Sequence, residues 1–135
     1  MSIEQNKAVV RRFNKEVIEN KKVELMDELF LPTFINRSVK PGFSAGPDGM
    51  VDFLKMFWDA FSDIKVEIHD QIGEGDKVTT RKTINGIHTG TFMNIPATNK
   101  KIEMNVIDIV RIREGKYAEH WNVIDMQGLF SQIKD

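Results

Sequence analysis

Carboxylates and an indole lie along two consecutive segments near the C-terminus. Asp108 stands in the alternating run 102–112, while Trp121 and Asp125 stand in the run 116–125. A carboxyl group beside apolar side chains is partly desolvated, which raises its pKa and favours proton exchange with a substrate near neutral pH. Asp125, which the pairing of the two runs places beside Val123 and Met104, is therefore the first candidate for acid–base chemistry.

The register of this hairpin predicts which side chains share a face. A two-residue turn at Glu114-Gly115 places Asp108 opposite Trp121. One face then carries apolar and polar side chains together, namely Met104, Val106, Asp108, Val110, Glu119, Trp121, Val123 and Asp125. An apolar lining with a few placed polar groups is typical of a ligand pocket. A one-residue bulge would exchange the two faces.

Both carboxylates also have a structural interpretation. Asp125 could end its strand and cap the turn that follows it. Asp108 could form a salt bridge with Arg111 or Arg113. The two carboxylates are too far apart along the strands for a glycosidase pair.

His88 is the next candidate, because Gly86 and Gly90 flank it. Glycines let the backbone approach another group closely, so His88 could contact a ligand or fill a structural position. The three histidines show no metal-ligand spacing, and the chain has no cysteine and no G-x-S-x-G motif. We therefore expect neither a metal nor another cofactor, and no cysteine or serine nucleophile.

Composition predicts one domain over residues 1–135. The chain has 19 basic and 20 acidic residues and a net charge of −1, so no basic field would recruit nucleic acid. The polar N-terminus lacks a signal peptide, and no apolar run approaches the roughly 20 residues of a membrane span. Together with the absence of cysteine, this predicts a cytoplasmic protein that has no membrane partner.

Apolar residues recur at helical spacing in the first half of the chain and at every second position in the second half. Ser2 and Gln5 have the form of a capping box. Helices are predicted from there to Ile18, over 23–30 and from Pro47 onward, and strands are predicted over 64–68, 77–87, 102–112 and 116–125. Helices followed by consecutive strands predict an α+β fold with an antiparallel sheet.

Two apolar surfaces remain to be assigned. The helix after Pro47 carries an apolar stripe that includes Phe57, which we expect to form core and to line part of a cavity. The second face of the last hairpin carries the apolar residues Ile107, Ile109, Ala118 and Ile124 among polar neighbours. A partly apolar face of this kind predicts a homodimer interface.

The C-terminal half resembles a known family. The stretch Gly86-Ile87-His88-Thr89-Gly90-Thr91-Phe92 with Ile95-Pro96-Ala97-Thr98, followed by Trp121-x-x-x-Asp125, is similar to the signature of SnoaL-like ester or polyketide cyclases. The resemblance runs from about Phe61 to Ile133. Asn36 stands where many relatives carry a histidine, and Asn99 replaces the glycine of P-x-T-G.

This resemblance implies a cone-shaped, curved antiparallel sheet packed on N-terminal helices, enclosing a pocket, in the nuclear-transport-factor-like superfamily. It implies a cofactor-free aldol-type cyclisation of a small, hydrophobic, carbonyl-containing ligand, with Asp125 as the acid/base. The expected substrate contacts are His88, Asn36, Trp121, Asp108, Phe57 and Met104. An isomerase or hydrolase on the same pocket, or a non-catalytic binding module, remains an alternative.

Overall fold

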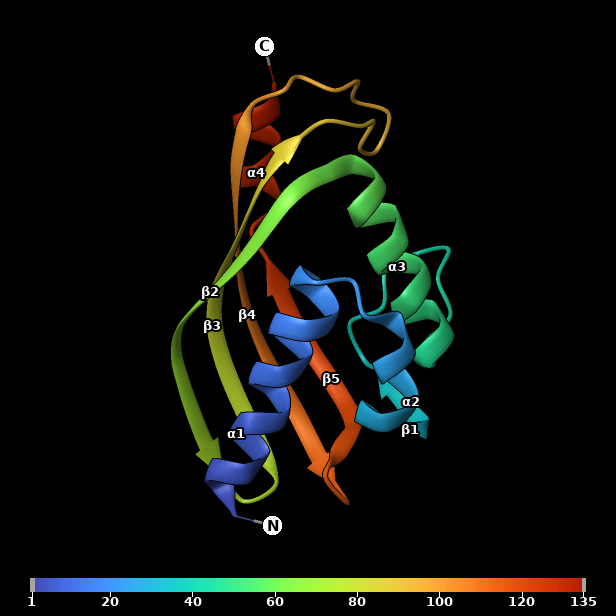
Figure 1. Cartoon of the computed structure of the whole chain (residues 1–135), viewed down its shortest axis with the longest axis vertical. Coiled ribbons are helices and arrows are strands. Elements are labelled where there is room, and N and C mark those ends of the chain that lie inside the picture. The colour runs from blue at the N-terminus through green and yellow to red at the C-terminus, as the bar shows by residue number, and fades with distance from the viewer. Residues whose placement is uncertain (1, 135) are drawn as a thin grey trace.

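The computed structural model describes residues 2–134, and Figure 1 shows how its elements are arranged. Helices occupy the first half of the chain and long strands the second, as the hydrophobic periods predict. In chain order, the elements are α1 (Ile3–Arg12), the π-helix η1 (Phe13–Glu19), the short helices η2 (Val23–Leu25) and α2 (Met26–Leu29), β1 (Phe30–Asn36), α3 (Pro47–Ala60), β2 (Phe61–Glu74), β3 (Lys77–His88), β4 (Lys101–Arg113), β5 (Lys116–Ile124) and α4 (Met126–Ile133). No helix among the described residues is long and apolar enough to cross a bilayer.

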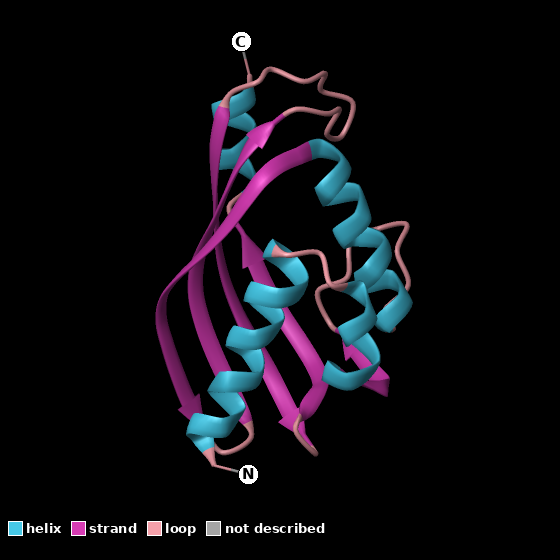
Figure 2. Ribbon diagram, viewed as in Figure 1, coloured by secondary structure: helices cyan, strands magenta, loops and turns pink. Residues whose placement is uncertain are grey.

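The five strands form one curved, open sheet in the order β1-β5-β4-β3-β2. Helices α1 and α3 lie against one face of this sheet (Figure 2). The predicted α+β class, with a curved sheet packed on N-terminal helices, is therefore confirmed. The prediction of a wholly antiparallel sheet was wrong, because β1 runs parallel to β5 and pairs Asn36 with His120.

Strand β1 begins where the sequence predicts the end of a helix. The predicted helix over 23–30 is broken into η2 and α2 and stops at Leu29, so that Phe30 already belongs to the strand. Pro32 cannot donate a ladder hydrogen bond, and it is tolerated here because β1 is an edge strand. The edge strand brings Asn36 beside β5, at the position where the polar part of the cavity forms.

The N-terminal helix begins with the predicted capping box and then widens. Ser2 accepts a hydrogen bond from the backbone N–H of Gln5, and the Gln5 side chain returns one to Ser2. From Phe13 the helix continues as a π-helix. This form is rare in proteins, and where it occurs it is often near a functional site. Its buried residues face the sheet; they are Phe13, Asn14, Val17 and Ile18.

The β4–β5 hairpin contains the one-residue bulge that the sequence left open. The turn at Glu114-Gly115 has two residues, both with positive φ, as a tight hairpin requires. Two pairs keep the predicted register, and the register then shifts between Ile112 and Arg111, so that Asp108 faces Asn122 rather than Trp121. The predicted inward face of β4 is correct, whereas the inward face of β5 is the other one: it carries His120, Asn122 and Ile124.

Candidate active site

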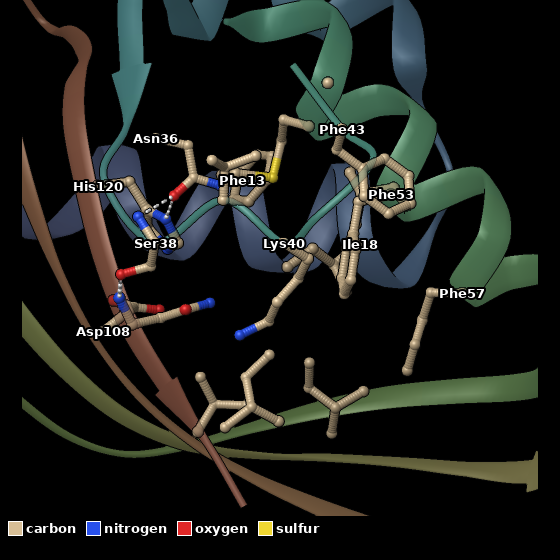
Figure 3. A pocket seen from close by; sticks show the side chains of 18 of the residues that line it. Phe13, Ile18, Asn36, Ser38, Lys40, Phe43, Phe53, Phe57, Asp108 and His120 are labelled. Atoms are coloured by element: carbon tan, nitrogen blue, oxygen red, sulfur yellow. Dashed lines mark hydrogen bonds between the residues drawn. The ribbon is translucent and has the colours of Figure 1, made fainter. Parts of the chain in front are cut away.

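A cavity lies between the sheet and the helices that cover it. Figure 3 shows side chains from η1, α3, the sheet and the loop 37–46 converging on it. The centre of a water molecule can occupy about 70 Å³ of it, and all space not filled by atoms, open mouth included, is about 790 Å³. Most of its lining is apolar or aromatic: Phe13, Ile18, Val39, Phe43, Met50, Phe53, Leu54, Phe57, Ile84, Met104, Val106, Tyr117 and Ile124. The polar lining residues are Asn36, Ser38, Lys40, Lys82, Asp108, His120 and Asn122. Asn36, Ser38, Asp108 and His120 lie together on one side in Figure 3.

A buried ion pair forms the centre of the polar side. The Lys82 ammonium lies 3.1 Å from Oδ2 of Asp108, and the two side chains are only 6% and 4% exposed. Lys82 also donates to Oδ1 of Asn14 at 2.6 Å. The Asn14 amide is itself fixed, because its Nδ2 donates to the carbonyl of Val10. Asn14 of the π-helix therefore positions the Lys82 ammonium, which in turn pairs with the Asp108 carboxylate.

The second oxygen of Asp108 is the unusual feature of this pair. Oδ1 is fully buried and has no hydrogen-bond partner among residues 2–134. A buried carboxylate oxygen without a partner is costly, since it loses water and gains nothing in exchange. Asp108 is among the residues that line the cavity, but Oδ1 has almost no surface open to it, so a bound molecule can use this acceptor only when neighbouring side chains shift.

Asn122 is the direct cross-strand partner of Asp108, so His120, two residues earlier on β5, lies diagonally across the ladder from Asp108. Burial lowers the pKa of His120 to about 4; the Asp108 carboxylate opposes this, and the charges of Lys82 and Lys40 add to it. The imidazole is therefore neutral at pH 7. It can accept a hydrogen bond or a proton at one nitrogen.

The hydrogen bonds of Asn36 identify that nitrogen. Oδ1 of Asn36 accepts the backbone N–H of Ser38 at 3.0 Å, which fixes it as the amide oxygen. His120 Nδ1 lies 3.1 Å from the same oxygen and must therefore donate to it. The neutral ring then carries its proton on Nδ1, and its lone pair is on Nε2.

Four of the seven predicted site residues line this cavity, namely Asn36, Phe57, Met104 and Asp108. Asp125, which the sequence places in the pocket, does not. It is exposed and caps α4, accepting the backbone N–H of Gly128 at 2.9 Å. Trp121 also lies outside, on the opposite face of the sheet, with the Lys77 ammonium 5.7 Å from its ring centroid. Both misplacements follow from the bulge, which turns these side chains away from the cavity.

His88 is buried but outside the cavity lining. The backbone N–H of Thr98 donates to its Nδ1 at 3.3 Å, and its own backbone bonds to Asn99 and Lys100. The flanking glycine does permit a close approach: a Cβ at Gly90 would lie 2.0 Å from the carbonyl oxygen of Asp59. That approach is to the end of α3 rather than to a ligand. His88 therefore holds the loop 89–100 in place.

The sequence interpretation missed Lys82 and His120. Lys82 alternates with Val78, Thr80 and Ile84 on the inward face of β3, and a lysine among such neighbours is a signal of a buried partner. His120 was assigned to the outer face of the hairpin, because the bulge was not placed. Tyr117 and Ala118, adjacent and both buried, break the alternation of β5 and mark where the bulge lies.

An open, curved sheet with helices over one face and a cavity between them is the arrangement of the nuclear-transport-factor-like α+β class. The sequence profile of the SnoaL-like polyketide cyclase family matches residues 8–133. The chain therefore belongs to this family, which confirms the predicted resemblance and supports a cofactor-independent cyclase. The isomerase, hydrolase and binding-module alternatives are not favoured.

Similar proteins agree with this assignment. Nogalonic acid methyl ester cyclase of Streptomyces nogalater is 24% identical over 115 residues, which cover 82% of this chain and 84% of that protein. The structure of TsrD from Streptomyces laurentii superposes with a TM-score of 0.89 at 24% identity, over 99% of this chain and 98% of that one. A SnoaL-like polyketide cyclase from Agrobacterium tumefaciens gives 0.78 at 13% identity, over 98% and 99%. These two structures show the shared fold.

Proposed function

We propose that this protein closes a ring in a mostly apolar, carbonyl-rich chain of the polyketide type by an intramolecular aldol reaction, with Asp108 as the acid–base group. The observation that carries the proposal is the buried carboxylate of Asp108, a residue that lines the cavity: one oxygen lies 3.1 Å from the Lys82 ammonium, and the other is buried without a partner among the described residues. The name of the Streptomyces nogalater relative, a methyl ester cyclase, supports the same substrate class.

The proposed reaction needs only groups that the chain supplies. Oδ1 of Asp108 accepts a proton from the carbon between or beside carbonyl groups, and the electron pair of that C–H bond becomes an enolate. Lys82 donates one N–H to Asn14 and lies in an ion pair with Asp108, and a further N–H of its ammonium would stabilise the enolate oxygen. The enolate carbon attacks the second carbonyl, and Asp108 returns the proton to the new alkoxide.

His120 has an orienting role in this proposal. Its neutral ring presents the Nε2 lone pair, which can accept a hydrogen bond from an enol or hydroxyl of the substrate. The aromatic and aliphatic side chains of the cavity, such as Phe13 and Met104, would keep the substrate's carbon chain folded, so that its two reacting carbons lie close together.

The test is turnover of a synthetic aromatic methyl ester that carries a 1,5-diketone side chain. The protein should convert it faster than buffer does into a cyclic product of equal mass, or of that mass less one water, as read by mass spectrometry. Heat-denatured protein is the control. No acceleration over buffer, by folded protein that binds the probe, would contradict the proposed function.

We also propose that the chain forms a homodimer through the outer face of its sheet. Apolar side chains stand exposed there, with Ile107 50%, Ile109 37% and Val123 75% exposed, and Trp121 lies among them. The predicted face needs correction, since Ala118 is buried and Ile124 lines the cavity. Monomers seldom leave a contiguous apolar patch of this kind uncovered. The predicted cytoplasmic location stays a prediction.

Light scattering is expected to give twice the chain mass of 15.5 kDa. Val123→Lys, which adds a charge at the centre of this face, should shift the mass to that of one chain. Met93→Lys, at an exposed apolar position in the loop 89–100, is the matched control and should leave the dimer intact. A single-chain mass for the parent protein at micromolar concentrations would exclude the dimer.

A further inference from the structure

Tyr117 is a lining residue of the cavity that has no part in the reaction described so far. It lies on β5, where it pairs with Ile112, and its side chain is only 2% exposed. His120 follows three positions later and lines the same cavity. Side chains three positions apart on a regular strand point to opposite faces, so it is the bulge that turns both of them inward.

An aromatic cluster fixes the ring of Tyr117. The ring stacks on Phe30, with 4.5 Å between the ring centroids and 27° between the ring planes. Phe13 of the π-helix packs against it at 5.0 Å, and Phe34 of β1 lies at 6.4 Å. A ring packed on so much aromatic surface keeps one orientation, so the hydroxyl that it carries has a defined position.

The hydroxyl of Tyr117 is a desolvated donor without a partner. No hydrogen bond holds it among residues 2–134. Burial raises the pKa of the Tyr117 phenol well above its ordinary value, and the nearby Asp108 carboxylate adds to this rise. The phenol therefore keeps its proton at neutral pH and can only donate it in a hydrogen bond. A hydroxyl that has lost water without gaining an acceptor is unfavourable, and an acceptor on a bound molecule would remove that cost.

This hydroxyl is also more open than the other polar groups that lack a partner. The fully buried side-chain atoms without one, among residues 2–134, are Asn6 Oδ1, His88 Nε2, Asp108 Oδ1 and Asn122 Oδ1. The oxygen of Tyr117 is not one of them, so a part of its surface stays open, and the space that Tyr117 lines is the cavity. A bound molecule therefore reaches this donor more readily than it reaches Oδ1 of Asp108.

We propose that Tyr117 donates its phenolic hydrogen to the carbonyl oxygen of the group that the enolate attacks, and so stabilises the alkoxide that forms there. This inference rests on the proposed function and adds a catalytic residue to it. The attack breaks the π bond of that carbonyl and places its electron pair on the oxygen, while the phenol keeps its proton. Lys82 serves the enolate oxygen and Tyr117 serves the second oxygen. One donor for each oxygen holds the two reacting carbons in one relative orientation.

The first test detects the contact without chemistry, because Tyr117 is the only tyrosine of the chain. Protein labelled with ¹³C at the tyrosine Cζ, the carbon that bears the hydroxyl, therefore gives a single NMR signal. Saturation with 2-acetylnaphthalene should shift this signal further than saturation with 2-isopropenylnaphthalene, in which CH₂ replaces the carbonyl oxygen. Equal shifts with the two compounds, or no shift with the ketone, would overturn the assignment.

The second test measures catalysis and stability on the same variant. With the diketone probe, Tyr117→Phe should lower kcat by about 10²-fold, as the loss of one oxyanion donor does, and leave KM within about threefold. Its midpoint in urea should be unchanged or higher, because the hydroxyl has no partner to lose. Thr83→Val is the matched control. The Thr83 hydroxyl lies outside the cavity lining and bonds to Asn105 and His69, both at 2.8 Å, so its loss should lower the midpoint and leave kcat unchanged.

The outcomes separate this inference from the proposed function. If the parent protein cyclises the probe and Tyr117→Phe keeps kcat within about threefold, the cyclase proposal stands and Tyr117 is not its donor. If neither protein cyclises the probe while the ketone still shifts the tyrosine signal selectively, Tyr117 is a carbonyl-binding residue and the cyclase proposal fails. A loss of stability in Tyr117→Phe as large as that in Thr83→Val would mean that the hydroxyl serves the fold instead.

Discussion

Asp108→Asn is expected to lower the rate of cyclisation by about 10²- to 10⁴-fold, the range that a positioned acid–base group supplies. The amide is nearly isosteric with the carboxylate, but it cannot accept the proton of a C–H bond. Asp125→Asn should leave the rate within about twofold, because Asp125 is exposed and asparagine caps a helix about as well as aspartate does. The measurement is kcat/KM with the diketone probe for the two variants side by side.

Asp108→Asn and Asp125→Asn are the same chemical change, so a difference between their rates reflects only the position of the aspartate. Asp108→Asn also leaves Lys82 without its counter-charge, so circular dichroism and binding of methyl 2-naphthoate must show that the cavity is still formed. An inactive Asp125→Asn with an active Asp108→Asn would restore the role that the W-x-x-x-D pattern implies. It would remove the cavity carboxylate from the mechanism.

The inward face of β4 could be predicted from the sequence, because the alternation of the run 102–112 is regular. Met104, Val106 and Asp108 point into the cavity as two-residue periodicity requires. The turn at Glu114-Gly115 likewise predicted the first pair of the hairpin, Arg113 with Lys116. These features depend only on neighbours in the chain.

The inward face of β5 could not be obtained in the same way. One extra residue after the turn reverses every later side chain, and a bulge costs so little that local residues signal it weakly. The structure stabilises the bulge through distant contacts: Arg111 bonds to Glu119 across the ladder and to Asp76 in the turn between β2 and β3. The error that placed Asp125 in the pocket is therefore the same error that left His120 out of it.

The ion-pair partner of Asp108 also could not be predicted from neighbouring residues in the sequence. Asp108 had two arginines near it in sequence, yet it pairs with Lys82, which is 26 positions away and one strand across in the sheet. The π-helix that supplies Asn14 has the same apolar spacing as an α-helix, so periodicity does not reveal it. The polar part of the site is thus a product of the tertiary arrangement.

Lys82→Met is expected to lower the free energy of unfolding by about 3–5 kcal/mol, because it leaves the Asp108 carboxylate buried and unpaired. Methionine has a similar length and keeps the packing of the lysine stem, so the loss isolates the charge. The double variant Lys82→Met/Asp108→Leu removes both charges and should recover most of that loss, since an apolar pair of similar volume is often as stable as a buried ion pair. Urea unfolding followed by circular dichroism measures all three proteins.

The neighbouring residue provides the control. Arg81 lies next to Lys82 on β3 and bonds Asp70 at 2.7 Å, but both side chains of this pair face solvent: Arg81 is 53% exposed and Asp70 is 56% exposed. Arg81→Met removes an ion pair of equal charge and should cost within about 1 kcal/mol, because water already screens that pair. If Lys82→Met were no more damaging than Arg81→Met, water would have to reach Asp108 in solution. Its carboxylate would then lack the desolvated setting that the proposed proton transfer uses.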